Sequence, residues 1–261
     1  MTTDRIRQAF GDARAENRAA FVAYLPAGFP TQEAFLREAT ALLGHADVLE
    51  VGLPYSDPLG DGPTIQRASE IALQNGATIQ STFTAIRALR AATEKPLLIM
   101  TYYNPVLAWG EERFVRDAVA AGVDGLILPD LPPDEAEDLR AHAHAAGLKL
   151  TFLIAPTSTP ERVRLVASAT TGFLYAVSVT GVTGARSGTA LHEVPALLDL
   201  ARQHTDLPIA VGFGVADRDS AQSVARLADG VVVGSALVTA ATQPGGVAEL
   251  AREIRAGCVR A

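Results

Sequence analysis

The stretch Val48-Leu49-Glu50-Val51-Gly52-Leu53-Pro54 is a short apolar run that ends at a glycine and a proline. Such boundaries are typical of β-strands. Its apolar residues are nearly continuous rather than alternating, which favours a parallel strand that is covered on both faces. Further runs of this kind recur at nearly regular intervals along the chain, over 21–25, 97–101, 125–128, 148–154, 173–177, 208–211 and 230–233.

Amphipathic helical patterns lie between these runs, over 31–43, 112–121, 134–146, 159–169, 217–227 and 247–256, and a further one over 5–14 precedes the first strand. Strands that alternate with helices over this length predict the α/β class, a closed (β/α)8 TIM barrel with an extra N-terminal helix. Longer connections follow strands 2 and 6, so we expect long loops there. A doubly wound open sheet is the alternative, but no Gly-x-Gly-x-x-Gly follows the first strand.

The composition is that of an ordinary globular chain, with 261 residues of which 48% are hydrophobic. We expect a single barrel domain over 1–261. The net charge of -7 argues against nucleic acid as a partner. One cysteine, the lack of a signal-peptide pattern and the lack of a membrane-spanning run together predict a cytoplasmic protein. No histidine lies at metal-ligand spacing from other ligand types, so we expect no metal.

Glu50 places a carboxylate inside an apolar strand, where an ionised group costs several kcal/mol unless it is paired or solvated. It could point outward or pair with a buried arginine. The functional interpretation is a carboxyl group that faces the barrel mouth with a raised pKa, as proton transfer requires.

The segment after this strand carries two more carboxylates, Asp57 and Asp61, among several prolines and glycines. Loop aspartates are often simple turn residues. The ends of strands 6, 7 and 8 are glycine-rich and contain Gly184, Gly214 and Gly234, followed by Ser235. Such glycines can be plain turns, but three of them at the expected strand ends indicate a phosphate-binding cradle.

The residues of this segment, with others, resemble the signature of the tryptophan synthase alpha chain family. The resemblance rests on Leu49-Glu50-Val51-Gly52, Ser56-Asp57-Pro58 and Asp61-Gly62-Pro63-Thr64-Ile65-Gln66. It extends over essentially the whole chain, through Tyr102-Tyr103-Asn104-Pro105, Gly181-Val182-Thr183-Gly184 and Gly212-Phe213-Gly214. It implies retro-aldol cleavage of indole-3-glycerol phosphate to indole and D-glyceraldehyde 3-phosphate, without a cofactor in this chain.

The resemblance also implies roles for individual residues. Glu50 is expected as the catalytic general acid/base, Asp61 as the second catalytic carboxylate and Tyr175 as the active-site tyrosine. Gly184, Gly214, Gly234 and Ser235 match phosphate-contact positions. Thr183 and Arg186 lie in the expected lid, where Arg186 either contacts phosphate or is solvated. For the indole pocket we expect Phe21 or Tyr24, together with Ile65, Met100, Leu128 and Phe213.

A partner follows from the same resemblance, namely a beta subunit that contains pyridoxal phosphate, in an alpha2beta2 heterotetramer. We expect Asp57 and Asn104 at that interface. The alternatives are a free-standing lyase that releases indole, a different phosphate-binding barrel enzyme such as a sugar-phosphate isomerase, and a catalytically silent regulatory subunit. The carboxylates and Tyr175 argue against the last of these.

Overall fold

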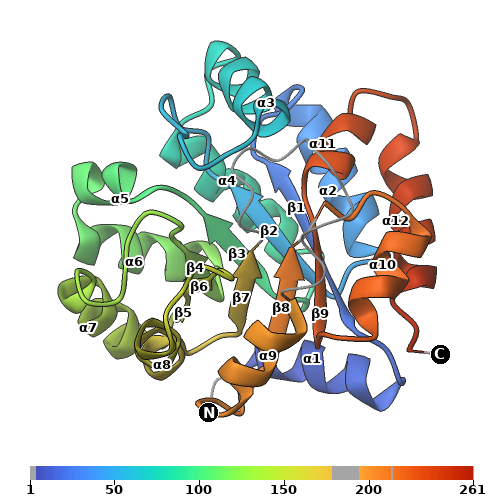
Figure 1. The fold of residues 1–261 in the computed structure, drawn as a ribbon. Coiled ribbons are helices and arrows are strands. Elements are labelled where there is room, and N and C mark those ends of the chain that lie inside the picture. The colour runs from blue at the N-terminus through green and yellow to red at the C-terminus, as the bar shows by residue number, and fades with distance from the viewer. Residues whose placement is uncertain (1–3, 178–193, 213, 261) are drawn as a thin grey trace.

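The computed structural model describes residues 4–177, 194–212 and 214–260, and their strands form one parallel sheet (Figure 1). The strands are β1 Ala20–Pro26, β2 Val48–Gly52, β3 Leu97–Met100, β4 Gly125–Ile127, β5 Lys149–Thr151, β6 Leu153–Ile154, β7 Leu174–Val177, β8 Ile209–Gly212 and β9 Gly230–Val233. The helices are α1 Arg5–Ala15, α2 Gln32–Leu43, α3 Pro63–Gln74, α4 Ile79–Arg90, α5 Tyr103–Trp109, α6 Glu111–Ala121, α7 Glu137–Ala146, α8 Pro160–Ala169, α9 Val194–Arg202, α10 Arg218–Ala225, α11 Ser235–Ala240 and α12 Gly246–Gly257.

The sheet closes into the barrel that the sequence predicts. β1 is hydrogen-bonded to both β2 and β9, so the first and last strands are neighbours. The remaining outer strands, β5 and β6, are consecutive pieces of the run expected at 148–154, and only Phe152 separates them. The Phe152 carbonyl accepts the Tyr175 N–H at 3.1 Å, so pairing with β7 continues across the break. The fifth strand is therefore one strand of the ring with a local interruption at Phe152.

Alternate residues of the strands point into the barrel, and α1 covers its N-terminal end (Figure 1). Ile6 and Phe10 of α1 belong to one buried cluster with Val22, Val48 and Leu98 from three neighbouring strands. The intervening strand residues pack in a larger cluster with the surrounding helices. Because strand side chains alternate between faces, Glu50 and Gly52 share the inner face of β2 with Val48.

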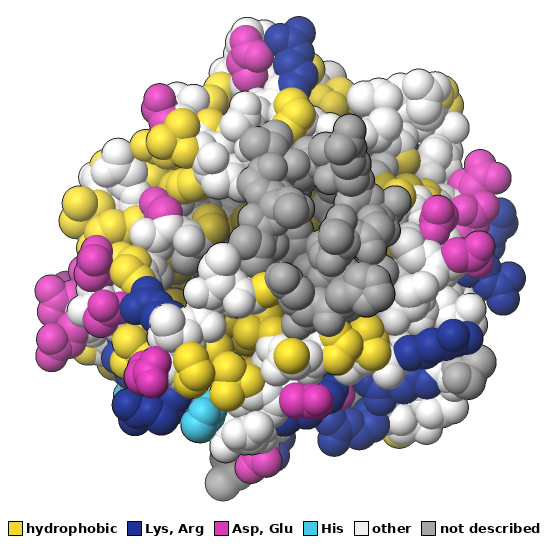
Figure 2. Space-filling view, in the orientation of Figure 1, with side chains coloured by type: hydrophobic (Ala, Val, Ile, Leu, Met, Phe, Trp, Pro, Cys, Tyr) yellow, Lys and Arg dark blue, Asp and Glu magenta, His cyan; other side chains and the backbone are white. Residues whose placement is uncertain are grey.

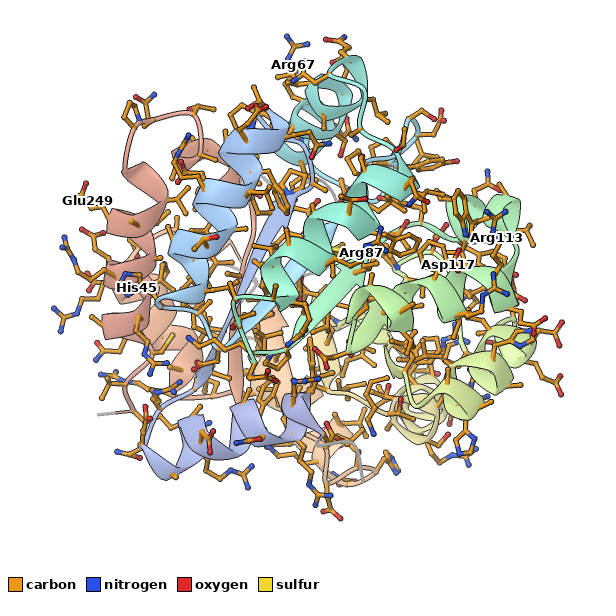
Figure 3. All side chains as sticks on the ribbon, turned by 180° about the vertical axis from the view of Figure 1, so that it is seen from behind. His45, Arg67, Arg87, Arg113, Asp117 and Glu249 are labelled. Carbon is orange, nitrogen blue, oxygen red and sulfur yellow. The ribbon has the colours of Figure 1, made fainter. Side chains whose placement is uncertain are left out.

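The helical layer is amphipathic, which explains why these segments fold as they do. Phe83 of α4 and Phe114 of α6 pack against each other below the surface, with ring centroids 5.3 Å apart. Figure 3 shows Arg87 on α4 and Arg113 and Asp117 on α6, whose side chains project from the outer side of the same helices. Within the described residues, no helix is long and apolar enough to cross a membrane, and no cluster of acidic, histidine or cysteine side chains could hold a metal ion.

The long connection after β2 differs from the expected loop. An irregular segment, residues 53–62, is followed by two helices, α3 and α4, so most of the extra length is helical. Pro63 stands in the first turn of α3, where a missing N–H breaks no intrahelical hydrogen bond. The expected long loop after strand 6 falls on 178–193, which lies outside the described residues.

Side chains at the N-terminal face tie neighbouring strands together in a repeated pattern. The carboxylates of Asp47, Asp124 and Asp229, each directly before a strand, accept an N–H at the start of the preceding strand, from Phe21, Leu97 and Ile209 respectively. The Thr171 hydroxyl accepts the Leu150 N–H in the same way. Arginines also pair with these aspartates; for example, Arg90 donates to Asp124 at 2.6 Å. These contacts are remote from the C-terminal strand ends and indicate a role in stability.

Asp124→Ala should destabilise the protein by about 3 kcal/mol, because it removes the carboxylate that pairs with the Arg90 guanidinium and leaves the Leu97 N–H without its acceptor. Urea unfolding followed by circular dichroism measures the effect. Asp134→Ala is the matched control, since its ion pair with Arg162 is solvent-exposed and its loss should leave the midpoint unchanged. Equal midpoints for both variants would show that the Asp124 contacts do not stabilise the barrel.

Candidate active site

Glu50 is fully buried on the inner face of β2, with Tyr24 of β1 and Leu98 of β3 as its register partners. Neither of its carboxyl oxygens has a hydrogen-bond partner among the described residues. It therefore neither points outward nor pairs with an arginine of the described part. Burial raises the pKa of Glu50 from 4.5 to about 8, so the group keeps its proton at neutral pH.

Asp61 is the second carboxyl group of this region and lies at the end of the irregular segment after β2. The Asp61 N–H donates to the Pro58 carbonyl at 3.0 Å, and the Gln66 side chain donates to the Asp61 carbonyl at 2.8 Å. Burial raises its pKa from 3.8 to about 6, while the nearby Tyr102 hydroxyl acts in the opposite direction. Asp61 is thus mostly ionised at neutral pH, whereas Glu50 is mostly protonated.

Two tyrosines lie near both carboxyl groups. Burial, followed by the charges of Glu50 and Asp61, raises the pKa of Tyr24 and of Tyr175 well above the ordinary value. Each ring extends over a glycine of the next strand. A Cβ on Gly52 would lie 2.7 Å from the Tyr24 ring, and one on Gly212 would lie 2.8 Å from the Tyr175 hydroxyl. The two glycines therefore make room for the rings at the C-terminal end of the barrel.

The structure corrects the expectation for Phe21. Phe21 is fully buried, but it belongs to the cluster between the strands and the helices, together with Ala23 and Leu25. It also sits near the start of β1, where its N–H binds Asp47 on the N-terminal face. Tyr24, the alternative to Phe21 for the indole pocket, lies on the inner face of β1 with Val22 and is close to the two carboxyl groups.

The other expected pocket residues have different placements. Met100 lines a small hollow together with Asp61, Tyr24 and Tyr102. The Ile65 side chain lies beside the end of β9, since a Cβ on Gly234 would be 3.7 Å from its Cδ1. Leu128 also differs from the expectation: Ile127 lies on the inner face of β4, whereas Leu128, directly after it, is buried in the cluster with the surrounding helices. Phe213 lies outside the described residues.

The glycine-rich strand ends are partly described. Gly214 has a φ of +53°, a conformation that side-chain-bearing residues rarely adopt, and none of the described residues lies within 4 Å of the place where its Cβ would be. Gly234 caps α11 and Ser235 begins it, so the first N–H groups of that helix face the barrel end. Gly184, Thr183 and Arg186 lie outside the described residues.

Asp57 and Asn104 are both exposed on this end of the molecule. The Asn104 amide donates to the Tyr55 hydroxyl at 3.1 Å. Asn104 lies on helix α5. In Figure 2 the charged side chains lie mainly toward the rim of this view, and hydrophobic or uncharged groups lie closer to its middle.

One residue of the site was missed by the sequence reasoning. Tyr102 follows β3, is 8% exposed, and its hydroxyl contacts the segment that carries Asp61. The motif Tyr102-Tyr103-Asn104-Pro105 drew attention to this stretch, but nothing in the sequence distinguishes the roles of the two adjacent tyrosines.

Comparisons with known proteins identify the family and the fold. The sequence model of the family described as "Tryptophan synthase alpha chain" matches residues 10–256. The tryptophan synthase alpha chain of Deinococcus radiodurans is 58% identical over 256 residues, which cover 98% of this chain and 95% of that protein. A structure of Mycobacterium tuberculosis tryptophan synthase superimposes with a TM-score of 0.93 at 45% identity, covering 98% of this chain and 99% of that one. The tryptophan synthase subunit alpha of Legionella pneumophila gives a TM-score of 0.89 at 33% identity, with coverage of 98% and 99%.

Proposed function

The chain belongs to the tryptophan synthase alpha chain family, and from this premise we propose that it cleaves indole-3-glycerol phosphate with Glu50 as proton carrier and Asp61 as stabilising anion. It is a carbon–carbon lyase of tryptophan biosynthesis, and its products are indole and D-glyceraldehyde 3-phosphate. The observation that carries the assignment of residues is the buried carboxyl group of Glu50 on the inner face of β2, which has no hydrogen-bond partner in the described part of the chain.

The reaction needs a proton before the C–C bond can break. Direct cleavage would leave negative charge on indole carbon 3, whereas protonation of that carbon gives an indolenine whose positively charged nitrogen accepts the bonding electrons. Glu50 holds its proton at neutral pH and can deliver it to carbon 3. The resulting carboxylate then takes the proton of the adjacent side-chain hydroxyl, the C–C bond breaks and the aldehyde forms. Glu50 ends protonated, so the cycle is balanced in protons.

Asp61 has the complementary property, because it is mostly ionised at neutral pH. A fixed carboxylate beside the ring nitrogen stabilises the positive charge that develops there when carbon 3 is protonated. Tyr24 and Tyr175 contribute the walls next to the two carboxyl groups, and Ile65, Met100 and Phe213 extend the apolar pocket for the indole ring. Tyr175 also offers a hydroxyl close to the reacting groups.

The phosphate of the substrate is assigned to the ends of β8 and β9. The space that the described residues leave beside Gly214 and the start of α11 at Ser235 support this assignment, because helix N-termini favour anions and glycine permits close approach. Gly234 and Gly184 complete the proposed cradle, while Thr183 and Arg186 belong to the proposed lid.

The assay for this function is incubation with indole-3-glycerol phosphate, with indole and glyceraldehyde 3-phosphate measured in equal amounts. We expect a bell-shaped dependence of kcat/KM on pH. Activity should rise through about pH 6 as Asp61 loses its proton, and fall through about pH 8 as Glu50 loses the proton that it must donate. Activity that stays constant on the alkaline side would contradict the role of Glu50 as the resting acid, and a lack of indole would contradict the function.

We further propose that a beta subunit that contains pyridoxal phosphate docks on the C-terminal face, in an alpha2beta2 complex that receives the indole. Asp57 and Asn104 are exposed there, and two apolar side chains are unusually exposed on the neighbouring elements, Leu59 at 90% and Leu107 at 55%. Exposed apolar groups within a polar rim are typical of docking surfaces. Analytical ultracentrifugation with a beta subunit tests the complex; no association and no activation would favour the free-standing lyase. A single domain and a cytoplasmic location fit this biosynthetic role.

A further inference from the structure

Tyr102 contacts the segment that carries the second carboxylate, one residue before Asp61. Its hydroxyl accepts the Gly60 N–H at 2.9 Å, and Tyr102 and Asp61 line the same small hollow. A phenol accepts and donates through the same oxygen, so a hydroxyl that accepts from Gly60 can still donate its own proton. Because Gly60 supplies the donor, the phenolic proton is free to go to the Asp61 carboxylate.

The backbone on both sides of Tyr102 is fixed. The Thr101 N–H donates to the Ile127 carbonyl at 3.0 Å, and the Tyr103 N–H donates to both carboxylate oxygens of Asp130, at 2.9 and 3.1 Å. The Tyr102 ring packs against Tyr55, with centroids 5.4 Å apart. The hydroxyl therefore projects from the fixed backbone at the end of β3, whereas Asp61 lies on the irregular segment 53–62, which contains no strand or helix.

We propose that the Tyr102 hydroxyl is a positioning group for Asp61, which it holds in the orientation that faces the ring nitrogen of the substrate. The inference rests on the proposed function, since the orientation of Asp61 matters only if the reaction requires an anion at that place. Tyr102 acts through Asp61 and need not touch the substrate.

Several titratable groups lie around Asp61, and the Tyr102 hydroxyl has an effect on the Asp61 pKa that differs from theirs. Tyr24 from β1, Glu50 from β2 and Tyr175 from β7 lie close enough to interact electrostatically with it or with one another, and Tyr102 joins them from the end of β3. Among these groups, the Tyr102 hydroxyl is the one that lowers the Asp61 pKa against the effect of burial. Removal of the hydroxyl alone should therefore raise that pKa.

Tyr102→Phe tests the proposal, because phenylalanine keeps the ring on Tyr55 and removes only the hydroxyl. We expect kcat for indole release to fall about tenfold at neutral pH through loss of orientation, with a much smaller change in KM. The acidic limb of the kcat profile should move up by about one pH unit, the size that a charge-assisted hydrogen bond gives. The control is Tyr103→Phe, the same change at the next residue, whose hydroxyl donates to Glu111 at 2.9 Å on α6; its profile should match that of the unchanged protein.

Different results would contradict the lyase function and the positioning role of Tyr102. If the unchanged protein releases no indole, the proposed function is wrong. If it releases indole and Tyr102→Phe leaves both kcat and the acidic limb unchanged, the positioning role is wrong. A lower kcat with an unmoved acidic limb would also overturn it, because general loss of packing, unlike loss of this hydroxyl, does not act on Asp61 ionisation.

Discussion

Glu50→Gln lowers kcat for indole release by at least about a hundredfold, the usual scale for loss of a general acid–base group. Glutamine keeps the shape of the side chain on the inner face of β2 but cannot supply or receive the proton. Substrate binding should change little, because no part of the proposed phosphate cradle is altered. Steady-state assays of a folded variant measure the effect, and near-normal turnover would contradict the assignment of Glu50.

The same substitution should make the protein more stable near neutral pH. Folded Glu50 keeps its proton up to about pH 8, whereas the unfolded chain loses it near the ordinary pKa of 4.5. The folded state thus binds more protons between these values, so the contribution of Glu50 becomes less favourable to folding as the pH rises through this window. At neutral pH, keeping Glu50 protonated lowers the free energy of unfolding by about 3 kcal/mol. The buried amide of the variant would itself destabilise the fold by about 1 kcal/mol, so Glu50→Gln should raise the free energy of unfolding by about 2 kcal/mol. Urea unfolding of both proteins measures the gain, which should shrink toward pH 4.5.

Asp61→Asn should reduce kcat by about a hundredfold or more, because the neutral amide no longer stabilises the positive charge on the ring nitrogen. The segment should keep its fold, since its backbone contacts with Pro58 and Gln66 do not use the carboxylate. Rapid-quench measurement of bound substrate separates chemistry from binding. Weaker binding with unchanged turnover of bound substrate would make Asp61 a binding residue and refute its catalytic role.

Much of the barrel could be predicted because each strand is a short apolar run between turn residues. The same property hides which residues face inward. A strand that is buried on both sides shows no alternation of polar and apolar residues, so the choice between Phe21 and Tyr24 was open until the parity of β1 was known. The interruption at Phe152 was hidden because residues 148–154 contain no glycine or proline that would mark a break.

The part of the site that lies on one strand could be predicted, and the part that depends on contacts between elements could not. Glu50 is conspicuous because a lone charge stands among apolar residues. Tyr102 is not, because its role depends on one hydroxyl that meets a backbone N–H from Gly60, far away in the sequence. Local pattern does not distinguish it from Tyr103, whose hydroxyl faces α6 instead.

The central claim is that Glu50 stores the reaction's proton in the resting enzyme. Infrared difference spectroscopy of the unchanged protein minus Glu50→Gln, recorded across pH, observes this carboxyl group directly. We predict the band of a protonated carboxyl group that persists at neutral pH and disappears only near pH 8. A carboxylate band already present near pH 5, close to the ordinary ionisation of a glutamate, would contradict the account.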